Sequence, residues 1–285
     1  MLDQRIISLY DEYTHKPLSR KEFLKRLAQL AGSTAAAMSV LPMLEPNYRK
    51  PEATQAGDLF TEYITWPGAN GEMKAFVARP MEEKPYAAVV VIHENRGLNA
   101  HIEDVAQRAA RAGYLAVAPN ALAPLGGTPA DEDAARKLFT ELKAEDNLKN
   151  FIGVFEQLTP RKDCNGQFGC VGFCWGGAMA NNLAVNVETR NAAVAFYGRQ
   201  PDAADVPKIK AAVQLHYAGL DERVNGGIAA YEEALKAAAA NYELYMYEGV
   251  NHAFHNDTSK ARYDEAAAKL AWERTLAFFE QYLKS

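Results

Sequence analysis

Apolar and polar positions along most of the chain predict strands that alternate with helices. The run at 87–92 is continuously apolar, which is typical of a strand buried on both faces of a parallel sheet. The next segment, 100–112, has apolar residues at helical spacing and ends at Gly113, a helix stop signal. A second strand is predicted at 114–119. This strand–helix order indicates a mostly parallel sheet with helices on both faces.

The pattern extends to both sides of this region. Upstream, strands at 59–66 and 73–79 flank the turn-rich segment 67–71 and predict an antiparallel hairpin. Downstream, the pattern predicts helices at 130–143, 146–159, 227–240 and 261–283, and strands at 168–171, 192–197, 211–217 and 242–248. These elements belong to one α/β domain, to which we assign residues 58–285.

The first 57 residues form an N-terminal extension that has two interpretations. Residues 19–25 read S-R-K-E-F-L-K and precede the uncharged stretch 27–44, as in a twin-arginine export signal, although a lysine replaces the second arginine. The alternative is an amphipathic helix at 20–30 that docks on the domain and is followed by a linker at 45–57. A working signal implies a periplasmic protein, and a docked helix leaves a cytoplasmic location.

Composition narrows the classes of function. Hydrophobic residues make up 48% of the 285, enough for a substantial core. The 31 basic and 36 acidic residues give a net charge of −5 without a dense basic block, which argues against a nucleic-acid partner. The stretch 27–44 is too polar for a stable membrane span. Cys164, Cys170 and Cys174 show no disulfide framework or metal-binding spacing, so we expect no metal or other cofactor. No oligomeric state is predicted.

One short motif carries the strongest chemical signal. Residues 172–177 read G-F-C-W-G-G and join an apolar strand to a predicted helix. This is the spacing of the G-x-S-x-G nucleophile elbow, with Cys174 in place of serine. Glycines around the apex let strand and helix approach closely and tolerate strained dihedrals. The motif predicts a covalent hydrolase.

A thiol nucleophile needs a base and a group that orients the base, and both follow in the expected order. Asp221 comes after the predicted strand at 211–217, and His252 after the strand at 242–248. Loops after parallel strands meet at one edge of the sheet, so we expect these groups to meet Cys174 there. The alternatives are a helix-capping role for Asp221 and a surface-loop position for His252.

Four other histidines compete for the role of base. His255 lies farther from the strand end than His252, and His216 falls inside a predicted strand, where a core position is expected. We expect His15 and His101 to face solvent. The candidate triad is therefore Cys174, Asp221 and His252.

Together with the segment 92–99, which reads I-H-E-N-R-G-L-N, the triad and elbow resemble the dienelactone hydrolase family, or carboxymethylenebutenolidases. The resemblance covers about residues 58–283. It implies an α/β-hydrolase fold and hydrolysis of esters or lactones. It also implies that Glu94 hydrogen-bonds and helps activate the cysteine, and that the main-chain N–H groups of Asn95 and Trp175 form the oxyanion hole.

The acid at position 94 stands out without the resemblance as well. Glu94 ends an apolar run, where a carboxylate is costly to bury without a partner. The alternative to a catalytic role is an ion pair with Arg96.

Substrate recognition is the point at which the chain departs from the family. Family enzymes that act on dienelactone hold its carboxylate with two arginines, one a few residues after the histidine, where this chain has Asn256. Arg136, Arg199 and Tyr197 are the remaining candidates for substrate binding. The resemblance therefore implies a small ester or lactone as substrate, without specifying dienelactone. The alternatives are a broad carboxylesterase or thioesterase for neutral acyl groups, and a non-catalytic binding protein of the same fold.

Overall fold

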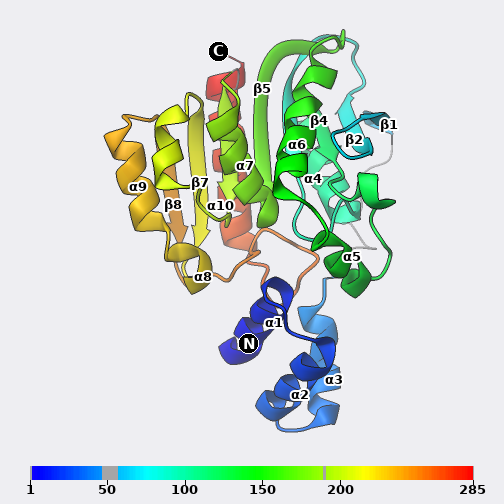
Figure 1. The fold of residues 1–285 in the computed structure, drawn as a ribbon, viewed down its shortest axis with the longest axis vertical. Helices are drawn as coiled ribbons and strands as arrows, with labels where there is room; N and C mark the ends of the chain where they lie inside the picture. Colours follow the sequence, from blue (N-terminus) through cyan, green and yellow to red (C-terminus); the bar gives the residue numbers. More distant parts are fainter. Residues whose placement is uncertain (1, 47–56, 189–190, 285) are drawn as a thin grey trace.

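A computed structural model describes residues 2–46, 57–188 and 191–284. Eight strands form one central sheet in the order β1-β2-β4-β3-β5-β6-β7-β8 (Figure 1). Their bounds are β1 Leu59–Pro67, β2 Glu72–Pro80, β3 Tyr86–Ile92, β4 Leu115–Pro119, β5 Cys164–Phe173, β6 Ala192–Phe196, β7 Ala212–Ala218 and β8 Tyr242–Tyr247.

The sheet is parallel except at one edge. Strands β1 and β2 form the predicted antiparallel hairpin, and β2 also runs antiparallel to β4. From β4 to β8 every neighbouring pair is parallel, with Val90 of β3 opposite Val117 on one side and Cys170 on the other. The carboxyl ends of β3, β5, β6, β7 and β8 therefore meet at one edge. The predicted fold class is confirmed.

Helices cover both faces of the sheet. The long elements are α4 Ala100–Arg111, α5 Glu132–Phe139, α6 Ala144–Leu158, α7 Trp175–Asn186, α9 Ile228–Ala237 and α10 Glu265–Leu283, with short helices η1 Ala123–Leu125, η2 Ala203–Lys208 and α8 Glu222–Asn225. Residues of α4 and α10 pack in one core cluster, and residues of α6, α7 and α9 pack in the other. Helix α10 starts later than predicted because Asp264 caps it, accepting a hydrogen bond from the Ala267 N–H at 2.9 Å.

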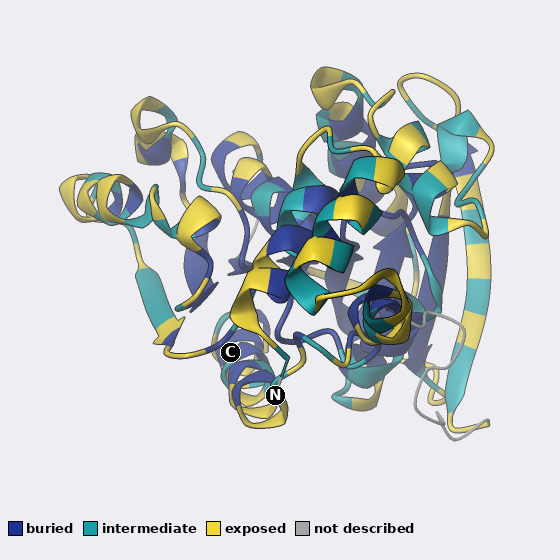
Figure 2. Ribbon diagram, turned by 90° about the horizontal axis from the view of Figure 1, so that it is seen from below, coloured by how far each residue is buried: buried dark blue, intermediate teal, exposed yellow. Residues whose placement is uncertain are grey.

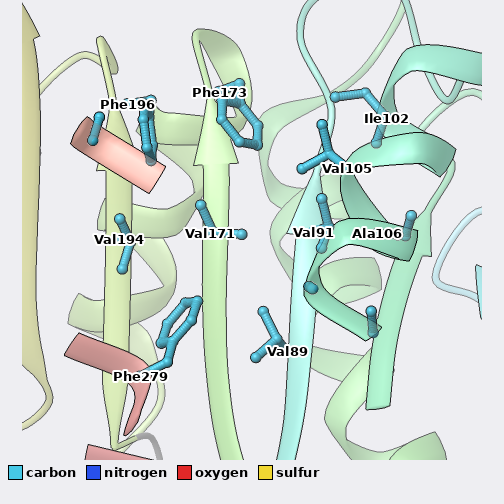
Figure 3. Close-up of a cluster of buried hydrophobic side chains, with 14 of the residues drawn as sticks. Val89, Val91, Ile102, Val105, Ala106, Val171, Phe173, Val194, Phe196 and Phe279 are labelled. Atoms are coloured by element: carbon cyan, nitrogen blue, oxygen red, sulfur yellow. The ribbon is translucent and has the colours of Figure 1, made fainter. Parts of the chain in front are cut away.

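The two core clusters explain why the central strands read as continuous apolar runs. Val89 and Val91 of β3 point to the face of the sheet that α4 and α10 cover, where they meet Val105 of α4 and Phe279 of α10 (Figure 3). Each such side chain contributes about 1.5–3 kcal/mol by leaving water. The inner strands are buried, whereas the edge strand β1 has mostly intermediate and exposed positions (Figure 2).

Three helices precede the sheet and lie beside the carboxyl ends of its strands (Figure 1). We call α1 Gln4–His15, α2 Arg20–Ala31 and α3 Thr34–Leu44 the N-terminal segment. It has its own apolar cluster, in which Tyr13 stacks on Phe23 with ring centroids 4.3 Å apart. Within the described ranges no single helix could cross a membrane; only α2 and α3 taken together, bent by 110°, have the length and composition. Most of the predicted linker, 47–56, lies outside the described residues.

Candidate active site

Cys174 lies at a strained elbow between β5 and α7. Its φ of 56° and ψ of −112° fall in a region that residues with a side chain rarely adopt. The neighbouring glycines leave no space for side chains. A Cβ on Gly172 would lie 1.9 Å from the carbonyl oxygen of Gly176, and one on Gly176 would lie 2.3 Å from that of Ile92. The elbow therefore requires glycine at both positions, and it places the thiol above the end of the sheet.

The structure brings the predicted acid and base together. Nδ1 of His252 lies 2.5 Å from Oδ2 of Asp221, and both residues are buried. The structure supports the alternative role of Asp221 but not that of His252. Asp221 also caps α8, accepting from the Val224 N–H at 3.2 Å, whereas His252 is not a surface residue. Its second nitrogen, Nε2, has no hydrogen-bond partner among the described residues, and a nitrogen of His252 lies within 4.8 Å of the Cys174 sulfur.

A second histidine reaches the same sulfur. Nε2 of His15, the last residue of α1, lies 3.2 Å from Sγ of Cys174, and its ring meets that of His252 edge-on at 4.8 Å. The expectation that His15 and His101 face solvent is wrong, because their side chains are only 12% and 2% exposed. No motif around His15 marked it, since the contact joins residues 159 positions apart.

Each of the two histidines has its own aspartate. Nδ1 of His15 lies 3.1 Å from Oδ1 of Asp11, an ion-pair distance, while its hydrogen bond goes to the Asp11 carbonyl oxygen at 2.9 Å. Arg223 lies between the pairs, with Nε 3.3 Å from Oδ2 of Asp11 and a terminal nitrogen 4.0 Å from Oδ1 of Asp221. Two Asp–His pairs therefore converge on one thiol.

This surrounding charge favours the thiolate form of the cysteine. Burial raises the pKa of Cys174, but the positive charges of His15 and His252 outweigh it and lower the pKa from 9.0 to about 6. Burial lowers the pKa of His252, yet Asp221 and the thiolate outweigh that effect and raise the pKa to about 10. A thiolate beside an imidazolium is thus the favoured state near neutral pH. The sulfur shares a direct hydrogen bond with His15, so the cluster is organised for proton sharing.

Glu94 does not make the contact that the family resemblance implied. Its Oε2 accepts a hydrogen bond from Nδ2 of Asn256 at 2.8 Å, and no hydrogen bond joins it to Cys174 within the described part of the chain. Nor do Glu94 and Arg96 form an ion pair there; the Arg96 guanidinium donates instead to Oδ1 of Asn95 at 2.7 Å. Asn256 is fully buried in support of Glu94, so this position is not part of a substrate-binding surface.

The two predicted oxyanion donors lie at the edge of the sulfur site. Trp175 is the first residue of α7, directly after Cys174, and Asn95 follows β3 in a turn. In the described ranges neither main-chain N–H donates to another protein group. The Trp175 ring stacks on His93 at 5.4 Å, which anchors the start of α7 against the end of β3. Their role as an oxyanion hole remains a prediction.

A pocket of about 740 Å³ opens beside Cys174 and contains the three predicted substrate-binding residues. Tyr197 is buried and packs on His252 with ring centroids 4.9 Å apart. The guanidinium of Arg136 is already engaged, since it donates to the Tyr13 carbonyl oxygen and lies 3.8 Å from the centre of that ring. Arg199 is exposed and makes no ion pair or hydrogen bond through its side chain to any described residue.

The pocket carries an excess of positive charge. Asp133 lines the pocket together with five cationic side chains, Lys16, Arg136, Lys137, Arg199 and Arg223. Arg136 is paired with Asp133 and Arg223 with Asp11, so Lys16, Lys137 and Arg199 make up the excess. This contrasts with the net charge of −5 of the whole chain. The local field therefore attracts anions.

The mostly parallel eight-stranded sheet, with a nucleophile elbow after β5 and the Asp221–His252 pair after β7 and β8, defines a protein of the α/β-hydrolase fold. Residues 73–283 match the dienelactone hydrolase family, and the chain belongs to that family. It is accordingly a hydrolase that acts on esters or lactones.

Individual relatives agree with this assignment. A protein of Synechocystis sp. named "Putative carboxymethylenebutenolidase" is 30% identical over 80% of this chain and 99% of its own length. One of Methylorubrum extorquens with the same name is 28% identical over 94% of this chain and 96% of its own length. The crystal structure of a "Putative Dienelactone Hydrolase" from Klebsiella pneumoniae superposes with a TM-score of 0.71 at 28% identity, covering 79% of this chain and all of the other.

Proposed function

We propose that this chain hydrolyses esters or lactones through a covalent acyl-enzyme on Cys174. The observation that carries the proposal is the buried thiol at the elbow beside His252, whose Nδ1 is held by Asp221 at 2.5 Å. Because Asp221 keeps a proton on Nδ1 of His252, Nε2 is the nitrogen that exchanges protons with the reacting groups.

The proposed reaction has two halves. In the first, Cys174 attacks the acyl carbon as the thiolate whose proton already lies on His252, and the tetrahedral oxyanion faces the N–H groups of Asn95 and Trp175. Collapse breaks the bond to the alkoxide, which takes the proton from His252. In the second half, neutral His252 takes a proton from water, the hydroxide attacks the thioester, and Cys174 leaves as thiolate. Each donor in such an oxyanion hole typically stabilises the transition state by about 2.7–4 kcal/mol.

Trapping the acyl-enzyme tests this proposal. The protein is mixed with p-nitrophenyl acetate, quenched with acid during the first turnover, digested and analysed by mass spectrometry. We expect one acetyl group on the peptide that contains Cys174 and none on those that contain Cys164 or Cys170. Rapid hydrolysis without any acetyl-cysteine, or with the acetyl group on another residue, contradicts the mechanism.

We also propose that the favoured substrates carry a carboxylate. The support is the positive pocket, and within it the exposed guanidinium of Arg199, which no described side chain neutralises. Arg136 is a weaker candidate because it already holds the Tyr13 carbonyl oxygen.

Arg199→Gln is expected to weaken hydrolysis of anionic substrates selectively. One charge-assisted contact is worth about 1.5–3 kcal/mol, so kcat/KM for an anionic lactone falls roughly 10- to 100-fold, whereas that for a neutral aryl acetate changes little. The measurement is the ratio of the two kcat/KM values. The matched control is Arg111→Gln. It removes a guanidinium at the end of helix α4 that is paired with Asp58. An unchanged ratio in Arg199→Gln would favour the broad esterase for neutral acyl groups.

The pH profile of kcat/KM provides another test. Cys174 reacts as the thiolate, present above its pKa of about 6, and His252 protonates the leaving group as imidazolium, present below its pKa of about 10. We expect kcat/KM for a neutral ester to rise through about pH 6, stay level and fall near pH 10. A rise centred near 9.0, the ordinary thiol value, would show that the site does not ionise the cysteine.

A further inference from the structure

We propose that His15 is a further catalytic residue, a fixed imidazolium that holds Cys174 as thiolate, so that the N-terminal segment forms part of the active site. This inference rests on the proposed function, because it assigns a role at the same nucleophile. His15 lies outside residues 73–283, which match the family. The match therefore does not account for it.

The geometry fixes which nitrogen of His15 faces the sulfur. Nδ1 lies 2.9 Å from the carbonyl oxygen of Asp11, an acceptor that requires a proton on Nδ1. Nε2 is then the atom 3.2 Å from Sγ of Cys174. When the ring is protonated, the Nε2–H group donates a charge-assisted hydrogen bond to the thiolate.

The charges around His15 support its protonated form. Burial lowers the pKa of His15, but the Cys174 thiolate and Asp11 outweigh that effect and raise it. Asp11 is itself held by Arg223. With both imidazoles protonated, the thiolate and the two aspartates balance His15, His252 and Arg223 in full. Glu94, Arg96 and Arg262 line a small cavity next to the sulfur, and the charged side chains of the pocket of about 740 Å³ lie on its other side.

Contacts of the two residues before His15 hold the end of α1 in place. Nδ2 of Asn95 donates to the Thr14 carbonyl oxygen at 2.9 Å, and the Tyr13 hydroxyl donates to Asp133 at 2.5 Å. Arg136 donates to the Tyr13 carbonyl oxygen. Asn95, whose main-chain N–H is a predicted oxyanion donor, is thus bonded through its side chain to the N-terminal segment. These bonds join α1 to two separate parts of the hydrolase domain, the turn after β3 and helix α5.

The docked segment leaves the site accessible. The pocket of about 740 Å³ reaches Cys174 while Thr14, His15 and Lys16 form part of its wall. A segment that blocked the nucleophile would fill this space. The N-terminal segment therefore completes one wall of the substrate site, with His15 in contact with the reacting atom.

His15 and His252 have separate tasks in this arrangement. His252 carries the proton that the thiol has lost and gives it to the leaving alkoxide, and it later accepts a proton from water. His15 keeps its proton throughout. It stabilises the thiolate before attack and again when sulfur leaves the thioester, the task that the family resemblance assigned to Glu94. Glu94 is instead bonded to Asn256.

The test compares thiol ionisation in variants of the full chain. The rate of Cys174 alkylation by iodoacetamide is followed against pH by mass spectrometry, with Cys164 and Cys170 as internal references. An opposite charge at this range typically lowers a pKa by about 1–3 units. His15→Gln, which keeps a polar side chain without the charge, should therefore raise the Cys174 inflection by about 1–3 pH units and move the acid limb of kcat/KM by the same amount. Asp11→Asn should move it in the same direction by less.

Controls separate this role from a structural one. Arg5→Gln removes a positive charge from the exposed start of the same helix and should leave the inflection unchanged. Thermal unfolding of each variant verifies that the fold is retained; if His15→Gln does not fold, Asp11→Asn decides. An unchanged inflection in the folded variants, or a shift produced by Glu94→Gln instead, overturns the inference. If Cys174 forms no acyl-enzyme in the parent, the proposed function fails, and this result is separate from the alkylation profiles.

Discussion

Cys174→Ala is expected to abolish ester hydrolysis while the protein keeps its fold. In the proposed mechanism the Cys174 sulfur carries the acyl group, and loss of a nucleophile in an assembled triad typically lowers kcat by about 10⁴-fold or more. Alanine fits the elbow, because its Cβ occupies the position of the cysteine Cβ and the strain at φ 56° is unchanged. The measurements are kcat/KM for p-nitrophenyl acetate and an anionic lactone, and the thermal midpoint.

Two further cysteine variants serve as a control and a comparison for Cys174→Ala. Cys164→Ala removes a half-buried thiol at the far end of β5 and should leave hydrolysis unchanged. Cys174→Ser should also be poor, since a hydroxyl is much less acidic than a thiol in the same charged surroundings. Residual turnover of Cys174→Ala within tenfold of the parent would exclude a covalent mechanism on this residue.

Asp221→Asn is expected to have the second-largest effect. The carboxylate holds the His252 Nδ1–H and stabilises the imidazolium, and an amide does neither. Analogous replacements lower kcat by about 10⁴-fold. Asp11 cannot substitute, because it is engaged with His15 and Arg223. We expect kcat to fall with little change in KM, measured with a neutral ester at pH 8.

The thermal midpoint distinguishes this loss from unfolding. The amide oxygen introduced by Asp221→Asn would still accept the hydrogen bond from the Val224 N–H, since asparagine caps helices as well as aspartate does. Asp205→Asn, at an exposed ion pair with Lys208, is the matched control and should be silent. A loss in kcat below tenfold for Asp221→Asn in a folded protein would remove Asp221 from the catalytic group.

Local sequence was sufficient for the fold class and for the elbow. The apolar run of β3 and the helical period of α4 each depend on neighbouring residues, so a strand–helix pattern can be recognised before any contact is known. The elbow is also local, because the steric need for Gly172 and Gly176 arises within one turn of chain. Asp221 and His252 could be predicted because loops after parallel strands share one edge of the sheet.

The sequence could not give the contacts that complete the site. The hydrogen bond between Glu94 and Asn256 joins residues 162 positions apart, and that between His15 and Cys174 joins residues 159 apart. Arg136 was a candidate for binding substrate, yet its guanidinium holds the N-terminal segment. In each case the residue type was compatible with several partners, and only packing selected one.

The sequence by itself thus determined the order of strands and helices and the elbow, and it placed the residues of the candidate triad after three strand ends. Only the tertiary structure decided what surrounds the thiol. The apolar face of α1 shows that the helix must be buried, but the periodicity does not specify against which surface. Docking at the carboxyl edge of the sheet brings Asp11 and His15 to Cys174, and it is this long-range packing that surrounds one sulfur with two imidazoles.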